Sequence, residues 1–257
     1  MISRPYPSSR PGYLINLPRL SYRTAWDLQK KIHQGVVDRD TAATILILEH
    51  DPVITLGRHA GWEHVLASPD RLMQLGIGCE RVERGGDVTY HGPGQLVAYP
   101  ILNLGLMGWG VKEFVRRLEE GIITTLADLD LPAGRRIGYP GVYIGPRKIA
   151  SLGLAVRHRV SFHGLALNCD PDMSHFQLIR PCGLVDVQMT SLTTELGQCP
   201  PVEKVRSSLS ARLGQALNLD LSEISLSVLE GYLDQSDIKS NLFVKKATSP
   251  NAKDLRT

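Results

Sequence analysis

Apolar and polar positions alternate along the first part of the chain in a pattern that predicts a helix followed by a strand. Ala25, Leu28 and Ile32 recur at the spacing of one helix face, and Ser21 stands where the first turn needs a cap. Residues 43–49 form an apolar stretch of strand length that ends at an Asp-Pro break.

Two longer amphipathic helices are expected further along. Apolar residues recur at helical spacing from Val111 to Leu129, and a Pro/Gly turn at residues 132–134 ends that pattern. A second helix is expected from Val202 to Leu217, and a weaker helical pattern covers residues 221–233.

Between these helices lie three adjacent strand-length segments, residues 142–144, 148–156 and 160–167, which are separated by Gly, Pro or Arg/His turns. Strands and helices do not alternate regularly. The pattern therefore predicts an α+β fold in which helices pack on a mixed or antiparallel sheet.

The chain of 257 residues, 42% of them hydrophobic, is long enough for one domain to bury a core without disulfides or metals. No internal repeat or low-complexity tract divides it. We expect a flexible N-terminal segment over residues 1–12, one folded domain over 13–233, and a polar, loosely ordered tail over 234–257.

Charge and cysteine usage exclude several classes of function. A net charge of +3 without a basic stripe does not indicate nucleic-acid binding, and no apolar run approaches the roughly 20 residues of a membrane span. The four cysteines show neither zinc-site nor disulfide-framework spacing. We expect a cytoplasmic protein without metal or cofactor; a short transit sequence at the Arg- and Ser-containing start is the less favoured alternative.

Residues 84–95 form a glycine-rich segment with two potential proton carriers, Asp87 and His91. Glycines allow close approach of a backbone to a ligand, and exposed N–H groups can hold an anion or a carbonyl oxygen. An ordinary turn-rich hairpin is the alternative. The phosphate-loop pattern is absent, so a nucleotide cradle is not indicated.

Lys148 follows a Gly-Pro turn and begins an apolar strand. Strand alternation predicts that Ser151 and Gly153 share one face of this strand and that Lys148 and Leu152 share the other. Gly153 would then leave space for an incoming chain. A surface lysine is the alternative.

Cys182 lies between a proline and a glycine, a setting unlike a core strand or a helix face. Backbone N–H groups and nearby cations in such a turn would lower the thiol pKa from its usual value of about 8.5 and raise its reactivity. Cys169, which follows an apolar strand, is the rival thiol. His163 and His91 are rival bases, because either one would make a Cys–His dyad.

Four segments together resemble the lipoyl(octanoyl) transferases, also called lipoate-protein ligase B. They are RGGDVTYHGPGQLVAYPI, GPRKIASLGLAVR, VSFHGLALN and PCGLVDVQMTSL. The resemblance runs from about residue 45 to about residue 197. It implies a fold similar to the catalytic domain of biotin and lipoate ligases. At Cys169 the chain departs from the family, which usually has an aliphatic residue there.

The resemblance also implies an activity: transfer of an octanoyl group from acyl carrier protein to a lysine of a lipoyl domain, in 2-oxo acid dehydrogenases or the glycine-cleavage H protein. The family uses a thioester acyl-enzyme, which implies Cys182 as nucleophile and Lys148 as its proton-handling partner. The implied acyl-binding residues are Arg84, Gly85, Gly86, Asp87, Val88, Thr89, Tyr90, His91, Ser151, Leu152, Gly153, Gly164, Leu165 and Ala166.

Two other functions remain open from the sequence. An ATP-dependent lipoate or biotin ligase on the same fold would activate a free acid and need no cysteine, and the Pro-Cys-Gly segment argues against it. A non-catalytic module that binds an acyl chain or a carrier protein would have lost the chemistry, and the presence of both Lys148 and Cys182 argues against that.

Overall fold

The computed structural model describes residues 9–39, 41–180 and 187–233. The expected polar tail and the first eight residues lie outside this range. Strand β1 begins at Arg10, so it starts within the last three residues of the segment expected to be flexible. None of the helices in the described ranges is long and apolar enough to cross a membrane.

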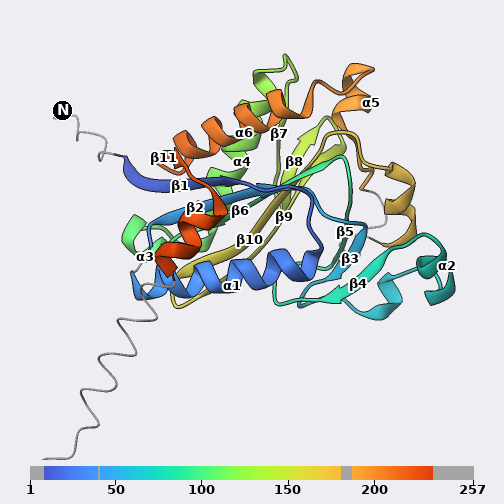
Figure 1. The fold of residues 1–257 in the computed structure, drawn as a ribbon. Coiled ribbons are helices and arrows are strands. Elements are labelled where there is room, and N and C mark those ends of the chain that lie inside the picture. Colours follow the sequence, from blue (N-terminus) through green and yellow to red (C-terminus); the bar gives the residue numbers. More distant parts are fainter. Residues whose placement is uncertain (1–8, 40, 181–186, 234–257) are drawn as a thin grey trace, which may run out of the picture.

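Eight strands of the described chain form one mixed sheet in the order β11-β1-β2-β6-β10-β9-β8-β7 (Figure 1). Strand β1 runs parallel to both of its neighbours, whereas every pair from β2 to β7 is antiparallel. The strands are β1 Arg10–Asn16, β2 Ala43–Leu48, β6 Gln95–Ile101, β7 Gly134–Arg136, β8 Tyr139–Ile144, β9 Arg147–Arg157, β10 Val160–Asn168 and β11 Leu219–Glu223.

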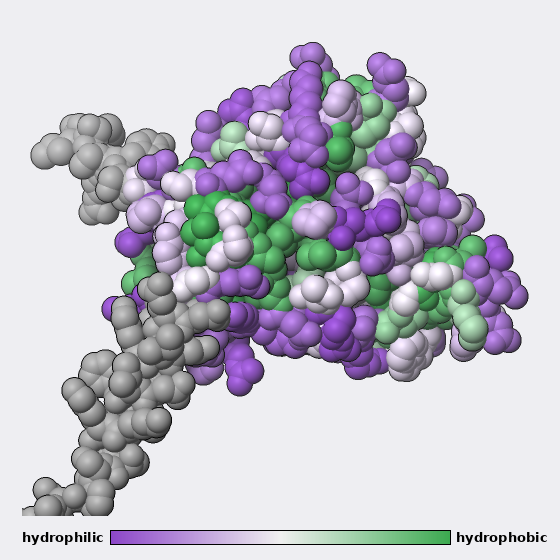
Figure 2. Space-filling view, viewed as in Figure 1, coloured by the Kyte–Doolittle hydropathy of each residue, from purple (hydrophilic) through white to green (hydrophobic). Residues whose placement is uncertain are grey.

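A smaller sheet of three strands, in the order β4-β3-β5, lies at one end of the molecule within the described residues (Figure 1). Its strands are β3 Val53–Leu56, β4 Gly78–Arg81 and β5 Val88–His91. The short helices η1 Trp62–His64, α2 Pro69–Gln74 and η2 Met173–Leu178 accompany it. Exposed apolar side chains gather near α2, where Met73 is 76% exposed, and over the helical residues 226–233 (Figure 2).

Helices cover both faces of the large sheet. On one face α4 Val111–Ala127 and α6 Val202–Ala216 pack through Phe114, Leu118 and Leu209 onto Leu96 of β6. On the other face α1 Tyr22–Asp38 buries Ile32 beside Tyr99 of β6. The remaining helices are α3 Leu104–Met107 and α5 Leu192–Leu196.

The α+β fold with helices on a mixed sheet, expected from the sequence, is confirmed. The predicted helix cap is present, because Ser21 Oγ accepts a hydrogen bond of 3.1 Å from the Thr24 N–H at the start of α1. The three predicted strands of the middle region correspond to β8, β9 and β10.

One predicted element is wrong in part. The first residues of the expected helix over 221–233 belong to β11, where Leu221 pairs with Gly12 of β1. Leu219 and Leu221 pack on the core while Asp220 between them is exposed. This alternation of period two is typical of a strand, and these residues form the edge strand of the large sheet. The helix begins at residue 226.

Candidate active site

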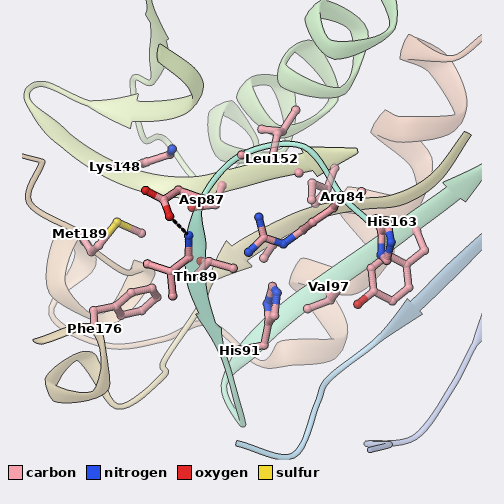
Figure 3. A pocket seen from close by; sticks show the side chains of 18 of the residues that line it. Arg84, Asp87, Thr89, His91, Val97, Lys148, Leu152, His163, Phe176 and Met189 are labelled. Atoms are coloured by element: carbon pink, nitrogen blue, oxygen red, sulfur yellow. Dashed lines mark hydrogen bonds between the residues drawn. The ribbon is translucent and has the colours of Figure 1, made fainter. Parts of the chain in front are cut away.

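A pocket lies between the α1 face of the large sheet and the glycine-rich segment that connects the two sheets (Figure 3). Lys148 and Asp87 lie toward one end of it and His163 toward the other, with the Arg84 guanidinium between them. Most of the residues proposed from the sequence line this pocket: Arg84, Gly86, Asp87, Val88, Thr89, His91, Lys148, Ser151, Leu152, Gly153, Gly164, Leu165 and Ala166.

Two described residues of the proposed set stand outside the lining, Gly85 and Tyr90. Gly85 turns its N–H to the Leu154 carbonyl at 2.7 Å and so joins the segment to β9. Tyr90 points into the core of the small sheet, where its ring packs on Phe176 and its hydroxyl lies 2.8 Å from His175 Nδ1. Gly85 and Tyr90 therefore support the pocket wall without lining the pocket.

The glycine-rich segment is not a hairpin. β5 pairs with β3 in the small sheet, whereas the next strand, β6, pairs with β2 and β10 in the large one. The turn between them crosses from one sheet to the other. At this crossing Gly94 has a φ of 81°, and a Cβ there would collide with the main chain of Asp170, so the turn requires glycine.

Arg84 is buried and is held by β3, the central strand of the small sheet. Its Nη2 donates to the Thr55 carbonyl at 2.7 Å and to Thr55 Oγ1 at 2.9 Å, and its Nη1 donates to the Gly85 carbonyl at 3.1 Å. Gly153 lies against the same side chain, since a Cβ at this position would be 2.9 Å from Arg84 Cδ. The absence of a side chain at residue 153 therefore keeps the pocket open beside a fixed guanidinium.

Asp87 is a buried carboxylate with a fixed orientation. Its Oδ1 accepts a hydrogen bond of 2.8 Å from the Val88 N–H (Figure 3). The same oxygen lies 2.7 Å from His64 Nδ1. His64 belongs to η1, so this contact also links η1 to the pocket. The carboxylate places negative charge at the Lys148 end.

Lys148 reaches the pocket because β9 carries a bulge. The register with β8 shifts where Val142 pairs with Ala150 but Tyr143 pairs with Lys148, so one extra residue stands on β9. Ile149 and Ala150 consequently both face the α4 side. Lys148 is turned to the face of Ser151 and Gly153, and the expectation that it lies on the opposite face is wrong.

The Lys148 side chain is only 8% exposed and crosses Gly141 of β8. A Cβ at Gly141 would collide with Lys148 Cε, so glycine at this position leaves the path for the lysine stem. The amine lies 5.7 Å from the centre of the Tyr143 ring. The packing of β9 against β8 therefore buries the amine of Lys148.

Cys182, the proposed nucleophile, lies outside the described residues, but the chain on both sides of it is fixed at this pocket. Before it, the Arg180 N–H donates to the His64 carbonyl at 2.8 Å. After it, Val187 lines the pocket, and the Lys148 N–H donates to the Gln188 carbonyl at 2.8 Å. Only four residues lie between Cys182 and Val187 in the sequence.

A directed chain of hydrogen bonds runs from the Lys148 strand to His91. Asn168 Nδ2 donates to the Thr190 carbonyl at 2.9 Å, and Asn168 Oδ1 accepts from Gln95 Nε2 at 2.9 Å. Gln95 Oε1 must then accept the 2.6 Å hydrogen bond from His91 Nδ1. A carbonyl can only accept, so the chain fixes every donor and places the His91 proton on Nδ1.

His91 is buried, and this desolvation, with a smaller contribution from His50, lowers its pKa to about 3. Burial also lowers the pKa of His163 below its usual range. Both imidazoles are therefore neutral near pH 7 and hold a transferred proton weakly. These shifts count against either one as the base of a Cys–His dyad.

The far end of the pocket contains residues that the sequence patterns did not indicate as ligand contacts. Tyr22 of α1 and Tyr99 of β6 line it beside His163, and Tyr22 Oη lies 3.2 Å from His163 Nδ1. His163 has a φ of 56° within β10. No short motif marks these tyrosines, because α1 and β6 meet only in the folded chain; Val97, Phe176, Val187 and Met189 complete the lining.

The rival thiol Cys169 lies on the other face of the sheet. It is 1% exposed and packs in the core under α4 and α6, away from the pocket. A hydrogen bond with Cys199, together with burial, raises its pKa well above the usual range. In the described part of the chain, no group of three or more His, Cys, Asp or Glu side chains is arranged to hold a metal ion.

Comparison with known proteins identifies the family. The model of the lipoyl protein ligase A/B catalytic domain matches residues 21–214. An octanoyltransferase of Chloroflexus aurantiacus is 44% identical over 207 residues, which are 79% of this chain and 93% of that protein. An octanoyltransferase of Syntrophobacter fumaroxidans is 41% identical over 225 residues, covering 88% and 99% of the two chains.

Solved structures agree on the fold at much lower identity. The crystal structure of lipoate-protein ligase A bound with ATP superposes with a TM-score of 0.73 at 18% identity, covering 88% of this chain and 93% of that one. A bi-partite lipoate protein ligase of Thermoplasma acidophilum gives 0.68 at 17%, covering 88% and 91%. The expected ligase-like fold is confirmed, and the chain belongs to the octanoyltransferases, acyltransferases that transfer an octanoyl group in protein lipoylation.

Proposed function

We propose that this octanoyltransferase takes its acyl group from octanoyl-acyl carrier protein and delivers it to a lysine of a lipoyl domain through a thioester on Cys182. One observation carries the proposal: the amine of Lys148 is buried in the same pocket whose wall holds the chain on both sides of Cys182. The acceptors we propose are the lipoyl domains of 2-oxo acid dehydrogenases and the glycine-cleavage H protein.

In the first half-reaction the Cys182 thiolate attacks the carbonyl carbon of the octanoyl thioester. A new C–S bond forms to Cys182, the C–S bond to the carrier breaks, and the carrier leaves as a thiol after taking a proton from the Lys148 ammonium, which becomes the neutral amine. Lys148 as an ammonium stabilises the thiolate, and backbone N–H groups of the pocket hold the oxyanion. The small residues Gly153 and Gly164 leave room for the eight-carbon chain.

In the second half-reaction the amine of the acceptor lysine attacks the Cys182 thioester. The amide C–N bond forms, the C–S bond to Cys182 breaks, and the proton of the attacking amine passes to Lys148 as a neutral amine. The exchange of a thioester for an amide is downhill and consumes no ATP. The weakly basic state of His91 and His163 supports Lys148 in this role.

The test is intact-protein mass spectrometry after incubation with octanoyl-acyl carrier protein. Wild type should gain one octanoyl group, Cys169→Ser should gain the same mass, and Cys182→Ser should gain none. Addition of a lipoyl domain should remove the label from wild type and transfer it to the acceptor lysine. A label that persists in Cys182→Ser and disappears in Cys169→Ser would overturn the assignment.

A second assay distinguishes an ATP-dependent ligase activity from the proposed octanoyl transfer. Free octanoate and ATP are supplied without carrier protein, and release of pyrophosphate is measured. The proposal requires no release above background. Protein that binds the carrier and never becomes labelled would instead be a non-catalytic binding module.

A further inference from the structure

We propose that Cys169 and Cys199 form a dithiol site that reacts with low-molecular-weight disulfides and closes to an intrachain disulfide. The site lies on the α4 and α6 face of the large sheet, opposite the acyl pocket. It carries no acyl group, and its chemistry needs neither the carrier protein nor Cys182.

The two thiols lie together although they are 30 positions apart in the sequence. Cys169 follows the last residue of β10, and Cys199 lies in the loop between α5 and α6. Cys199 packs against the core cluster that contains Cys169, and the two thiols are near enough for each to shift the pKa of the other. Proximity of two thiols within one packed cluster is the first requirement for a disulfide.

The main chain around Cys169 is held on both sides. Its N–H donates to the Gly94 carbonyl at 3.0 Å, and its carbonyl accepts from the Thr193 N–H of α5 at 3.1 Å. Thr193 Oγ1 also donates to Asp170 Oδ1 at 2.6 Å. These bonds fix α5, and with it the start of the loop to Cys199, against the end of β10.

The two sulfurs are unequal in reactivity. Cys199 is half-buried, and the hydrogen bond from Cys169 lowers its pKa to about 7 even though burial and the charge of Asp170 act in the opposite direction. Cys169 is buried and its pKa is raised. A partly exposed thiolate beside a buried thiol is the arrangement of an attacking and a resolving cysteine.

The reaction balances with a small disulfide as the oxidant. The Cys199 thiolate attacks one sulfur of the disulfide, forming a mixed disulfide and expelling one small thiolate, which takes up a proton. The Cys169 thiol then loses its proton and attacks Cys199 Sγ, and the second small thiol leaves. Two protein thiols are oxidised to one disulfide, and one small disulfide is reduced to two thiols.

The disulfide would close a loop that matters to the acyl site. Residues 169–199 include Cys182 and also residues 188–190, whose main chain is hydrogen-bonded to Lys148. Joining the ends of this loop restricts its freedom in the unfolded chain and fixes α5 to β10. We therefore expect oxidation to raise the melting temperature, by about 10 °C for a loop of this length in a chain of this size.

The experiment treats the full chain with oxidised glutathione, blocks remaining thiols with iodoacetamide, and maps the cysteines by mass spectrometry after proteolysis without reduction. Cys79 is the internal control, because it is half-buried in β4 and burial raises its pKa. Wild type should yield a peptide pair linked between Cys169 and Cys199, with Cys79 alkylated. Melting temperature is measured before and after oxidation.

Variants separate the outcomes. Cys199→Ser should abolish the linked pair and the rise in melting temperature, Cys169→Val should leave Cys199 as a stable glutathione adduct, and Cys79→Ser should behave as wild type. The same link should form in Cys182→Ser. Full alkylation of both thiols after oxidation overturns the proposal, as does a stable glutathione adduct on Cys199 of wild type or a link from either thiol to Cys182.

Discussion

The side-chain amide of Asn168 donates a hydrogen bond of 2.9 Å to the main-chain carbonyl of Thr190, the residue whose N–H donates to the Lys148 carbonyl at 2.9 Å. The two bonds join the end of β10 to the residues that follow the Cys182 segment. The same amide accepts from Gln95, the first residue of β6, so Asn168 also joins β10 to the strand that follows the glycine turn. One buried side chain thus holds three parts of the pocket wall.

Replacement of Asn168 by leucine should damage both stability and activity. It leaves the Thr190 carbonyl and Gln95 Nε2 buried without these hydrogen bonds, at about 1–3 kcal/mol each. We expect a fall in the free energy of unfolding within that range per group and a loss of at least about tenfold in kcat, since Lys148 loses a fixed neighbour. Urea unfolding and octanoyl transfer measure the two effects.

The control for Asn168→Leu is Asn16→Leu, at an exposed asparagine of β1 whose side chain bonds Glu223 away from the pocket. This control should stay within about 0.5 kcal/mol of wild type and keep full activity. Equal kcat for Asn168→Leu and Asn16→Leu would contradict the positioning role of Asn168.

Replacement of Gly153 by alanine should narrow the pocket. The new Cβ would be 2.9 Å from Arg84 Cδ, and the hydrogen bonds of Arg84 to Thr55 keep that side chain from moving aside. We expect kcat/KM for octanoyl donors to fall by about tenfold or more, with a smaller loss for butanoyl donors. Donors of increasing chain length provide the measurement.

Gly134→Ala is the matched control, because nothing lies within 4 Å of a Cβ there and the residue belongs to the edge strand β7. It should leave the chain-length profile unchanged. A uniform loss across all donor lengths in Gly153→Ala would indicate general misfolding of β9 and would contradict a steric limit on the chain.

The buried state of His91 predicts a fall in stability in mild acid. The unfolded chain binds a proton at this imidazole below about pH 6.5, whereas the folded chain binds it only near pH 3. Stability is therefore complete above pH 6.5 and is lost as the pH falls toward 3, at up to about 1.4 kcal/mol per pH unit for this group. Urea unfolding between pH 7 and pH 4.5 measures the slope.

His91→Gln should make that slope shallower, because glutamine does not titrate and its amide can still donate to Gln95. His59→Gln, at an exposed histidine, should keep the wild-type slope. Identical slopes for wild type and His91→Gln would show that the imidazole is not held neutral in the folded chain.

The sequence predicted those elements whose hydrophobic period is local. Ser21 and the apolar face behind it marked the start of α1, and the strands on both sides of the Arg/His turn at residues 158–159 were found from their length and alternation. Such patterns depend only on neighbours along the chain. The parallel pairing of β11 with β1 depends on residues some 200 positions apart, so residues 221–223 were assigned to a helix.

The site was predictable in its residue types and not in its geometry. Simple alternation placed Lys148 on the wrong face, because the bulge of β9 is set by its register with β8. Tyr22 and Tyr99 were missed, since a tyrosine in α1 or β6 is indistinguishable from a core residue until the two elements meet. Register and the meeting of distant elements are tertiary properties.

Replacement of Lys148 by arginine should separate its two proposed roles. Arginine keeps a positive charge to stabilise the Cys182 thiolate, but it does not lose a proton at neutral pH and so cannot accept one from the acceptor lysine. We expect octanoyl-enzyme to form and accumulate while transfer to the lipoyl domain slows by about 10²- to 10⁴-fold. Lys148→Met should slow both half-reactions, because it removes the charge as well as the base.

The measurement for Lys148→Arg is single-turnover mass spectrometry that follows the octanoyl-enzyme and the octanoylated domain separately. Lys112→Arg, at an exposed lysine of α4, is the matched control and should behave as wild type. Because the Lys148 stem crosses Gly141 closely, thermal unfolding must first show that the variant is folded. Transfer at the wild-type rate in folded Lys148→Arg would exclude Lys148 as the base. Slow acylation with normal transfer would show that Lys148 has only the electrostatic role.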